Sequence, residues 1–350
     1  MQQAVSSDHR AVRVWLYVIA AMVVAMVVIG GATRLTDSGL SITEWAPLSG
    51  ALPPLSAADW ASEFARYRET TEYQTINRGM SLADFQFIYW WEWGHRQWGR
   101  LMGLAFALPL AFFWATGRLT PYLKPRLLLL LVLGASQGAI GWWMVKSGLV
   151  NRVDVSQYRL AAHLTMACVI FAYALWLARS LVPRGEGDAR VAWGAGALTG
   201  LVLAQIGLGG FVAGMDAGLV YNTWPLMDGA FVPRGLLPSG ALAHLFDDAK
   251  TVQFIHRIGA YALLATAWAY ALWVWFGAPR FRRGALVFAA LVTGQASIGI
   301  ATLVTQVPMG WALAHQLGAI VLLGAAIIHW RGATFSSPSR VALPEAMQTA

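Results

Sequence analysis

The stretch WWEWGHRQWGRL, residues 90–101, places a glutamate, a histidine and two arginines among four tryptophans. An apolar segment follows at once, and about 20 apolar residues are enough for a helix to cross a bilayer. A second stretch, QFIHRIGAYALL, residues 253–264, also has a His-Arg pair that leads into an apolar run. Ionisable residues in or near a bilayer are costly and usually mark function. The two stretches therefore predict related polar sites near the ends of membrane-spanning helices.

The composition of the whole chain is that of a membrane protein. Of its 350 residues, 57% are hydrophobic and only 12% are charged, whereas charged residues make up about 25% of ordinary soluble domains. We predict an all-α membrane protein with eight transmembrane helices. The apolar runs that carry them are Arg13–Arg34, Arg100–Arg118, Arg126–Lys146, Arg159–Arg179, Val191–Met215, Ile258–Ala278, Ala285–Thr305 and Gly310–Trp330.

The net charge of +8 is better explained by the orientation of the helices in the membrane than by binding to nucleic acid, because the basic residues are scattered at helix ends and form no patch. Most of them fall on the side of the chain termini, and the positive-inside rule assigns that side to the cytoplasm. The short opposite loop with Lys146, Arg152 and Arg159 is also basic. We expect both termini to be cytoplasmic and the first apolar run to be a retained helix. The only cysteine, Cys168, lies in an apolar run and predicts a packing role.

The chain contains a weak internal repeat. GGATRLTDSGL at Gly30 resembles GGFVAGMDAGL at Gly209, and SQGAIG at Ser136 resembles GQASIG at Gly294. Since four helices separate the copies, both have the same membrane orientation. We predict two tandem pseudo-symmetric four-helix bundles, residues 14–182 and 188–331, with polar outer segments 34–90 and 216–252 above them. The small-residue pairs Gly134 with Gly138 and Gly210 with Gly214 most simply predict close contacts between helices, and close approach to a flat cofactor is the alternative.

Four histidines are predicted at the outer ends of the even-numbered helices, namely His95, His163, His256 and His315. One such histidine would most simply be a hydrogen-bonded interfacial side chain, but four at a matched depth, two per repeat, favour a functional site. Two histidines fall short of a closed four-ligand zinc site. They suit the two axial positions of a haem iron, whose macrocycle supplies the other ligands. His9, His244 and His329 fit no such pair and are assigned to no metal.

The residues beside these histidines differ between the repeats. Arg96 and Arg257 each follow a proposed ligand, where they would either pair with haem propionates or extend to the interface as unspecific basic side chains. Glu92 lies one helical turn before His95, while the corresponding residue before His256 is Gln253. Glu92 either forms a surface ion pair with Arg96 or takes part in chemistry that only the first site performs.

The strings EWGHRQWGR, TDSGLS, HRIGA and AHQLGA, together with the duplicated eight-helix pattern, resemble the haem A synthase family over residues 14–331. The resemblance implies oxidation of the C8 methyl of haem O to a formyl group by successive hydroxylations, which gives haem A for cytochrome oxidase. It implies that His256 and His315 hold haem b, that the site of His95 and His163 receives haem O, and that Glu92 is a functional acid. It is closest to the proteobacterial and mitochondrial branch, which suggests a bacterial inner membrane. The chain lacks the outer-loop cysteine pair of some members.

Two other functions use the same histidines. A di-haem electron carrier of the cytochrome b type would hold two identical haems permanently, and a haem transporter or assembly protein would release haem chemically unchanged. As partners we expect haem O, membrane lipid and an electron donor. Haem O synthase, cytochrome oxidase assembly factors and a second copy of the chain are further candidates, and no nucleic acid is expected.

Overall fold

The computed structural model describes residues 2–149, 152–182, 186–236 and 244–334. This part of the chain holds eight helices that are long and apolar enough to cross a membrane, which confirms the predicted all-α membrane fold. They are α1 (Gln2–Leu35), α4 (Leu82–Ala115), α5 (Leu123–Gly148), α6 (Gln157–Ser180), α7 (Ala189–Gly214), α8 (Ala249–Gly277), α9 (Arg282–Val304) and α10 (Met309–Ala333). The shorter elements are α2 (Ala57–Arg68), α3 (Thr71–Thr75), η1 (Ser49–Ala51), η2 (Ala217–Leu219) and η4 (Pro279–Phe281).

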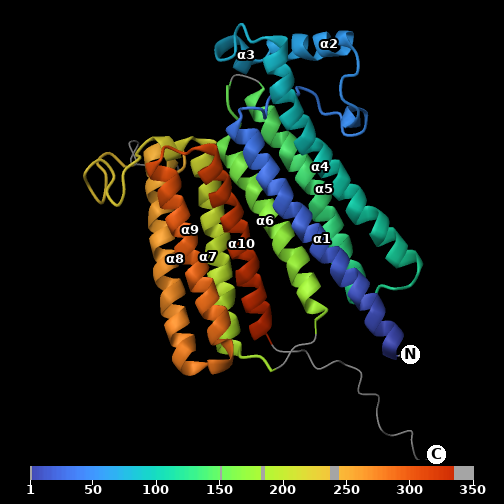
Figure 1. Ribbon diagram of the computed structural model, residues 1–350, viewed down its shortest axis with the longest axis vertical. Helices are drawn as coiled ribbons and strands as arrows, with labels where there is room; N and C mark the ends of the chain where they lie inside the picture. Colours follow the sequence, from blue (N-terminus) through green and yellow to red (C-terminus); the bar gives the residue numbers. More distant parts are fainter. Residues whose placement is uncertain (1, 150–151, 183–185, 237–243, 335–350) are drawn as a thin grey trace, which may run out of the picture.

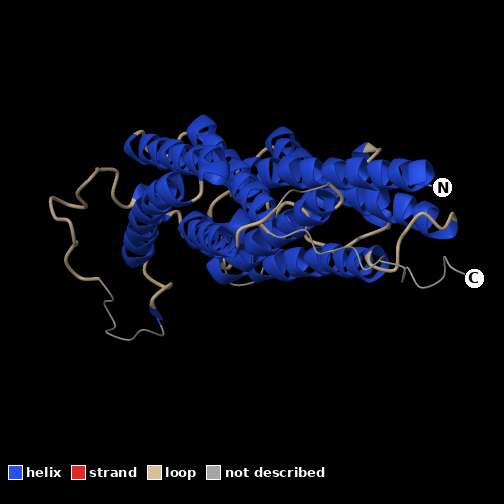
Figure 2. Cartoon of the chain, turned by 90° about the horizontal axis from the view of Figure 1, so that it is seen from below, coloured by secondary structure: helices blue, strands red, loops and turns tan. Residues whose placement is uncertain are grey.

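The eight helices form one elongated bundle. Helices α1, α6, α7 and α10 pack against one another in its middle, with α4 and α5 on one flank and α8 and α9 on the other (Figure 1). Seen from below, the long helices lie in a bundle with the connecting loops gathered at its ends (Figure 2). A single apolar core runs through the bundle, from Leu16 of α1 through Phe171 of α6 to Leu323 of α10. Both predicted four-helix units contribute to this core, and their division into separate domains stays a prediction.

Local sequence signals explain where the helices begin and how one of them tolerates a proline. Ser81 begins α4 because its hydroxyl accepts the backbone N–H of Asp84, and Asp248 begins α8 in the same way. Pro109 lies inside α4 and cannot donate to the carbonyl of Ala105, four residues earlier. The indole nitrogen of Trp15 in α1 donates to that carbonyl instead, at 2.9 Å.

The helix that carries His95 begins earlier than the predicted run at Arg100. Helix α4 starts at Leu82, and its first turns stand beyond the other helices next to α2 and α3 (Figure 1). These turns are mixed polar and aromatic, so a search for apolar runs does not detect them. They are held by an aromatic cluster, here called the outer cap, whose members include Trp60, Phe64, Tyr67, Tyr73, Phe85 and Tyr89.

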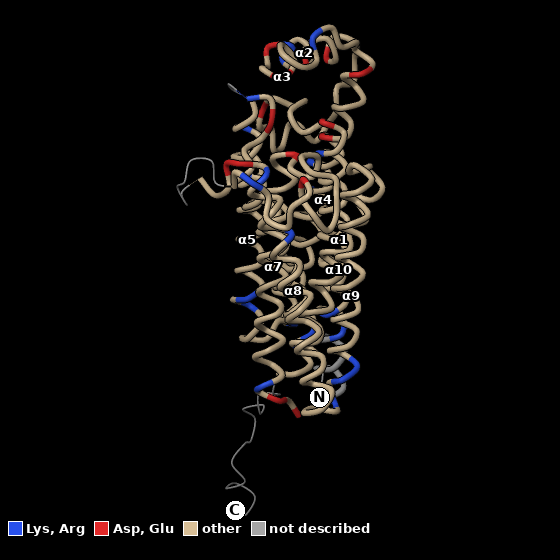
Figure 3. Tube along the Cα trace, turned by 90° about the vertical axis from the view of Figure 1, so that its left-hand side faces the viewer, with Lys and Arg blue, Asp and Glu red and all other residues tan. Residues whose placement is uncertain are grey.

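The charges are distributed unevenly along the bundle. Most acidic residues lie at the end with α2 and α3, and mainly Lys and Arg occupy the end at which α1 begins (Figure 3). Helix α10 ends at that same basic end (Figure 1). This arrangement agrees with the loop charges from which the cytoplasmic placement of the termini was predicted.

Two predictions about small residues have opposite outcomes. A methyl group at Gly210 would lie 2.8 Å from Cα of Ala161, and one at Gly214 would lie 2.7 Å from Cα of Gln157, so α6 and α7 do approach closely there. The prediction was wrong for Gly134 and Gly138, because α5 is the least buried of the long helices and nothing lies within 4 Å of a methyl group at either position. Cys168 is buried in the core, as predicted.

Glu72 is a buried acid within the outer cap. Its side chain accepts a hydrogen bond from the Tyr67 hydroxyl at 3.1 Å, and Asn77 donates to that same hydroxyl at 2.7 Å. Burial raises the pKa of Glu72 from 4.5 to about 7, against the opposing effect of the Tyr67 hydrogen bond. The folded cap therefore binds a proton that the unfolded segment would release.

We predict that the outer cap is less stable at alkaline pH. The contribution of protonated Glu72 is fully present below pH 4.5, the usual pKa of the group, and is lost as pH rises through about 7. Limited proteolysis of the segment around α2 and α3 should therefore be faster at pH 8 than at pH 5.5. Glu72→Gln should remove most of this difference, while Glu63→Gln, which alters an ion pair with Arg66 on α2, should retain it. An equal pH dependence in both variants would contradict the assignment to Glu72.

Candidate functional site

Each of the four predicted histidines lies against a glycine of the preceding long helix. A methyl group at that glycine would fall within 3.4 Å of the histidine Cε1 atom in every case. The pairs are His95 with Gly30 at 3.1 Å, His163 with Gly141 at 2.9 Å, His256 with Gly209 at 3.4 Å and His315 with Gly299 at 2.7 Å. We call these four glycines the histidine seats. A Cβ would press on the imidazole ring at Gly30, Gly141 and Gly299 and would just touch it at Gly209, so glycine allows the closest approach of ring and helix.

The predicted matched depth of the histidines needs one correction. His163, His256 and His315 each lie within about two turns of the first residue of their helix. His95 lies about three and a half turns from the start of α4, because that helix continues outward into the outer cap. Its position opposite Gly30 nevertheless corresponds to that of His256 opposite Gly209 in the sequence repeat.

His256 and His315 form a facing pair. Their ring centroids are 6.5 Å apart, and the ring planes meet at 81°. Two imidazole nitrogens at about 2 Å from one metal ion, on rings whose centres lie about 1 Å further back, would place the centroids roughly 6 Å apart. This spacing would allow both histidines to ligate one metal ion between them. Within the described residues, no three or more His, Cys, Asp or Glu side chains form a cluster of their own.

His95 and His163 are held differently. The side-chain amide of Gln137 on α5 donates to the backbone carbonyl of His163 at 2.8 Å, but Nδ1 of His163 is buried and has no hydrogen-bond partner in the described part of the chain. Among those residues the structure also records no ring contact between His95 and His163. Both rings still lie against their glycines, Gly30 and Gly141. The N-terminal site therefore has the same packing of histidine on glycine as the C-terminal site, with fewer contacts to the rings.

Glu92 forms a buried network and not a surface ion pair. Its side chain is only 4% exposed. Oε2 accepts hydrogen bonds from the Ser41 hydroxyl and the Ile42 backbone N–H, both at 2.8 Å. Oε1 accepts from Arg96 at 2.6 Å. The predicted pairing with Arg96 is confirmed, but the carboxylate also fixes the start of the outer loop after α1.

The two predicted propionate partners bind loop carbonyls. Arg96 donates to the carbonyls of Ile42 at 2.8 Å and Glu44 at 2.9 Å. Arg257 donates to the carbonyls of Tyr221 and Thr223, both at 2.8 Å. Each arginine therefore ties a histidine-bearing helix to the outer loop of its own half. An interaction with propionates stays a prediction.

The difference between Glu92 and Gln253 extends to their partners. Gln253 is also buried, and its amide donates to the carbonyl of Tyr221 at 3.1 Å. The residue that corresponds to Ser41 in the repeat is Val220, which offers no side-chain donor. The N-terminal loop is thus held through a carboxylate that accepts hydrogen bonds, and the C-terminal loop through an amide that donates one.

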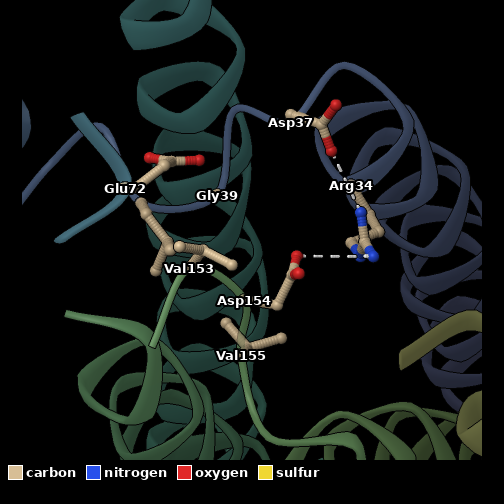
Figure 4. Close-up of a pocket in the computed structure, with 8 residues that line it drawn as sticks. Arg34, Asp37, Gly39, Glu72, Val153, Asp154 and Val155 are labelled. Carbon is tan, nitrogen blue, oxygen red and sulfur yellow. Dashed lines mark hydrogen bonds and ion pairs between the residues drawn. The ribbon is translucent and has the colours of Figure 1, made fainter. Parts of the chain in front are cut away.

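Arg34 connects the outer loops around a small pocket. It pairs with Asp37 at 3.1 Å, with Asp154 at 3.6 Å and with Asp216 at 2.8 Å. Figure 4 shows Arg34, Asp37 and Asp154 beside the pocket, with Glu72 on its far side. Asp37 and Asp216 correspond in the repeat and adopt the same left-handed backbone, with φ of 48° and 47°. Arg34 therefore joins the two halves at the level of their outer loops.

The remaining histidines have other partners. His329 lies 2.8 Å from the Tyr270 hydroxyl near the inner end of α10, and His244 lies 3.0 Å from a carboxylate oxygen of Asp247. The side chain of His9 lies outside the described residues. Nothing in the sequence indicated that Ser41 bonds Glu92. The sequence also did not show that Gln205 and Gln295 donate to the backbone carbonyls of His256 and His315. The repeat of SQGAIG and GQASIG offered a signal for Gln295, since it places a glutamine at the same position in both halves.

Comparisons with known proteins agree with this geometry. The family described as cytochrome oxidase assembly protein matches residues 13–327. A protein named Heme A synthase from Chelativorans sp. (strain BNC1) is 55% identical over 336 residues, which cover 93% of this chain and 92% of the relative. Heme A synthase from Rhizobium meliloti (strain 1021) is 52% identical over 344 residues, covering 96% and 93%. Heme A synthase from Brucella ovis is 52% identical over 329 residues, covering 93% and 92%.

We predict that Glu92→Gln loosens the outer loop after α1. The substitution removes the negative charge that the Ile42 N–H, the Ser41 hydroxyl and Arg96 share, and a hydrogen bond to a charged group is worth about 1.5–3 kcal/mol. In a Cys168→Ala background, a cysteine at Thr43 should then react roughly tenfold faster with a thiol reagent. Glu63→Gln on α2 serves as the control and should leave this rate unchanged. An unchanged rate in Glu92→Gln would mean that Arg96 alone holds the loop.

Proposed function

The chain belongs to the cytochrome oxidase assembly protein family, among the haem A synthases, and we propose that it oxidises the C8 methyl of haem O to a formyl group by successive hydroxylations. The product would be haem A for cytochrome oxidase. The structural observation that best supports this proposal is the presence of two histidine-pair sites on one scaffold, only one of which carries an acid. One site can hold a permanent cofactor while the other receives the substrate.

We assign haem b to His256 and His315. The support is their facing geometry, with ring centroids 6.5 Å apart, and their seats on Gly209 and Gly299. When bound there, haem b would supply one-electron redox chemistry. His256 on α8 and His315 on α10 would hold the iron, and Arg257 ties α8 to the outer loop of the same half through the carbonyls of Tyr221 and Thr223. Arg257 is also the residue we assign to the propionates of haem b.

We assign the substrate haem O to the site of His95 and His163. Arg96 provides positive charge beside it, within reach of a propionate if the guanidinium exchanges a loop carbonyl for a carboxylate. Glu92 accepts hydrogen bonds from three groups and donates none in the structure. We infer that it serves as a fixed negative charge and proton acceptor next to the substrate, a role that Gln253 cannot perform in the other half.

A di-haem electron carrier is the strongest alternative, and the four matching histidine seats favour it. The four histidine seats alone would suit two equivalent haems. The polar residues around the two sites differ, however, because Glu92 and Ser41 correspond to Gln253 and Val220. The rings of His163 and His315 also have different hydrogen-bond partners. This difference favours one exchangeable and one permanent ligand.

The protein has eight candidate membrane spans, and we place it in a bacterial inner membrane with both termini in the cytoplasm. The distribution of charges in Figure 3 supports this orientation. It puts the histidine pairs and the outer cap on the periplasmic side. An electron donor, haem O synthase, cytochrome oxidase assembly factors and a second copy of the chain are the partners we propose besides haem O and lipid.

The proposed reaction predicts a specific defect in Glu92→Gln. Cells that supply haem O and express the parent chain should contain haem A, identified by mass after extraction. In Glu92→Gln, haem A should fall by about 10² to 10⁴ in rate, the usual contribution of general acid or base assistance, while haem O or a hydroxylated product accumulates. The matched control is Ser41→Val, which weakens the same loop contact but keeps the acid, and it should retain most of the haem A. Equal losses in both variants would show that Glu92 acts only by holding the loop, and wild-type haem A in Glu92→Gln would exclude a role in the reaction.

The assigned haem b site predicts the absorption spectrum of variants. His256→Ala and His315→Ala should each abolish or strongly alter the low-spin haem spectrum of the purified protein, because one axial imidazole is lost. His329→Ala, which removes a histidine bonded to Tyr270 at the inner end of α10, is the control and should leave the spectrum unchanged. An unaltered spectrum in both site variants would place haem b elsewhere.

A further inference from the structure

Both histidines of the C-terminal site are held by a glutamine. The amide nitrogen of Gln205 on α7 donates to the backbone carbonyl of His256 at 2.8 Å and lies 3.1 Å from Nδ1 of the same ring. Gln295 on α9 contacts His315 in the same way, at 2.7 Å and 3.1 Å. In each case the amide fixes the edge of the ring that carries Nδ1. This leaves Nε2 as the nitrogen available to a metal.

A glycine three residues after each histidine makes room for that glutamine. A methyl group at Gly259 would lie 2.3 Å from Oε1 of Gln205, and one at Gly318 would lie 2.1 Å from Oε1 of Gln295. No side chain other than hydrogen is compatible with the observed position of either amide. The strings HRIG, residues 256–259, and HQLG, residues 315–318, therefore each combine a histidine with the space for its glutamine.

His95 of the N-terminal site lacks both arrangements. The residue that corresponds to Gln205 is Met26, and the one that corresponds to Gly259 is Trp98, whose indole donates to the carbonyl of Met22 at 3.0 Å. A methionine sulfur is only a weak acceptor and cannot replace the amide. His95 thus has neither the glutamine nor the space for one.

The second N-terminal histidine has the glutamine but not the space. Gln137 corresponds to Gln295, yet the residue that corresponds to Gly318 is Met166. Gln137 bonds only the backbone carbonyl of His163, and Nδ1 of His163 has no partner in the described residues. A larger side chain at position 166 is thus associated with the loss of the contact that Gln295 makes.

We propose that Gln205 with Gly259 and Gln295 with Gly318 are positioning pairs that make haem binding permanent in the C-terminal site, and that Met26, Trp98 and Met166 keep the N-terminal site exchangeable. This inference rests on the proposed function. Hydrogen bonds from neighbouring groups to a ligating histidine fix its ring and typically change metal affinity by about 10- to 100-fold. Ligation through Nε2 requires the proton on Nδ1, and the glutamine would meet that proton with its carbonyl oxygen only by turning the amide and giving up its hydrogen bond to the histidine's backbone carbonyl. The same enzyme can then retain a cofactor and release a product through otherwise similar histidine pairs.

Replacing Gly259 or Gly318 with alanine adds one methyl group beside each glutamine and tests the proposal. Gly259→Ala and Gly318→Ala should push the end of a flexible glutamine away from the ring while the helix backbones stay in place. Haem loss from the C-terminal site of the purified protein to excess apomyoglobin should become about 10- to 100-fold faster, and the low-spin spectrum and midpoint potential should shift. Gly200→Ala on α7 is the matched control, because nothing lies within 4 Å of a methyl group there, and it should behave as the parent protein.

The converse variant tests the N-terminal site. Met166→Gly should open the space that lets Gln137 reach Nδ1 of His163, so haem b added in excess and bound at the N-terminal site should dissociate more slowly. Parent-like haem loss and an unshifted spectrum in both Gly259→Ala and Gly318→Ala would overturn the positioning role. A parent protein in which His256 and His315 bind no haem would instead overturn the proposed function, and the inference with it.

Discussion

The contact between a histidine ring and a glycine backbone determines how the two sites are built. A ring whose Cε1 atom lies 2.7 to 3.4 Å from the place a Cβ would occupy leaves little or no room for that Cβ. Glycine costs about 0.5–1 kcal/mol in a helix interior relative to alanine, and the chain accepts this cost opposite all four histidines. The spacing of the helix pairs α1 and α4, α5 and α6, α7 and α8, and α9 and α10 is thereby matched to an imidazole ring. The imidazoles are thus positioned by backbone packing before any polar contact is considered.

On this shared scaffold, the polar partners determine what each half can do. Gln205 and Gln295 restrain both rings in the C-terminal site, whereas the N-terminal site places its strongest polar contacts on Glu92 and the loop after α1. One half therefore restrains the ligands, and the other restrains the loop and an acid beside them. A duplicated fold can acquire two functions in this way without a change in the path of its helices.

The sequence alone predicted the eight helices and the position of His163, His256 and His315 near the starts of their helices, because apolar length and the cost of polar groups in a bilayer are strong signals. It did not predict the start of α4 at Leu82, since these turns stand outside the apolar run and depend on the packing of Phe85 in α4 against Tyr67 in α2. It also missed the contact between Ser41 and Glu92, which joins residues far apart in the chain. The glycine at position 259 could be read as helix packing until the structure placed Gln205 against it.

The buried acid of the N-terminal site is difficult to explain by stability alone. A buried ion pair repays its desolvation only when the geometry is good and the remaining lone pairs are satisfied. Glu92 meets that condition through Arg96, Ser41 and Ile42, yet the other half holds the corresponding loop with Gln253 and no net charge on that side chain. A neutral amide is thus sufficient for the architecture. The carboxylate has an additional hydroxyl partner at position 41, and the simplest physical reason for this arrangement is the role proposed for Glu92 beside the proposed haem O site.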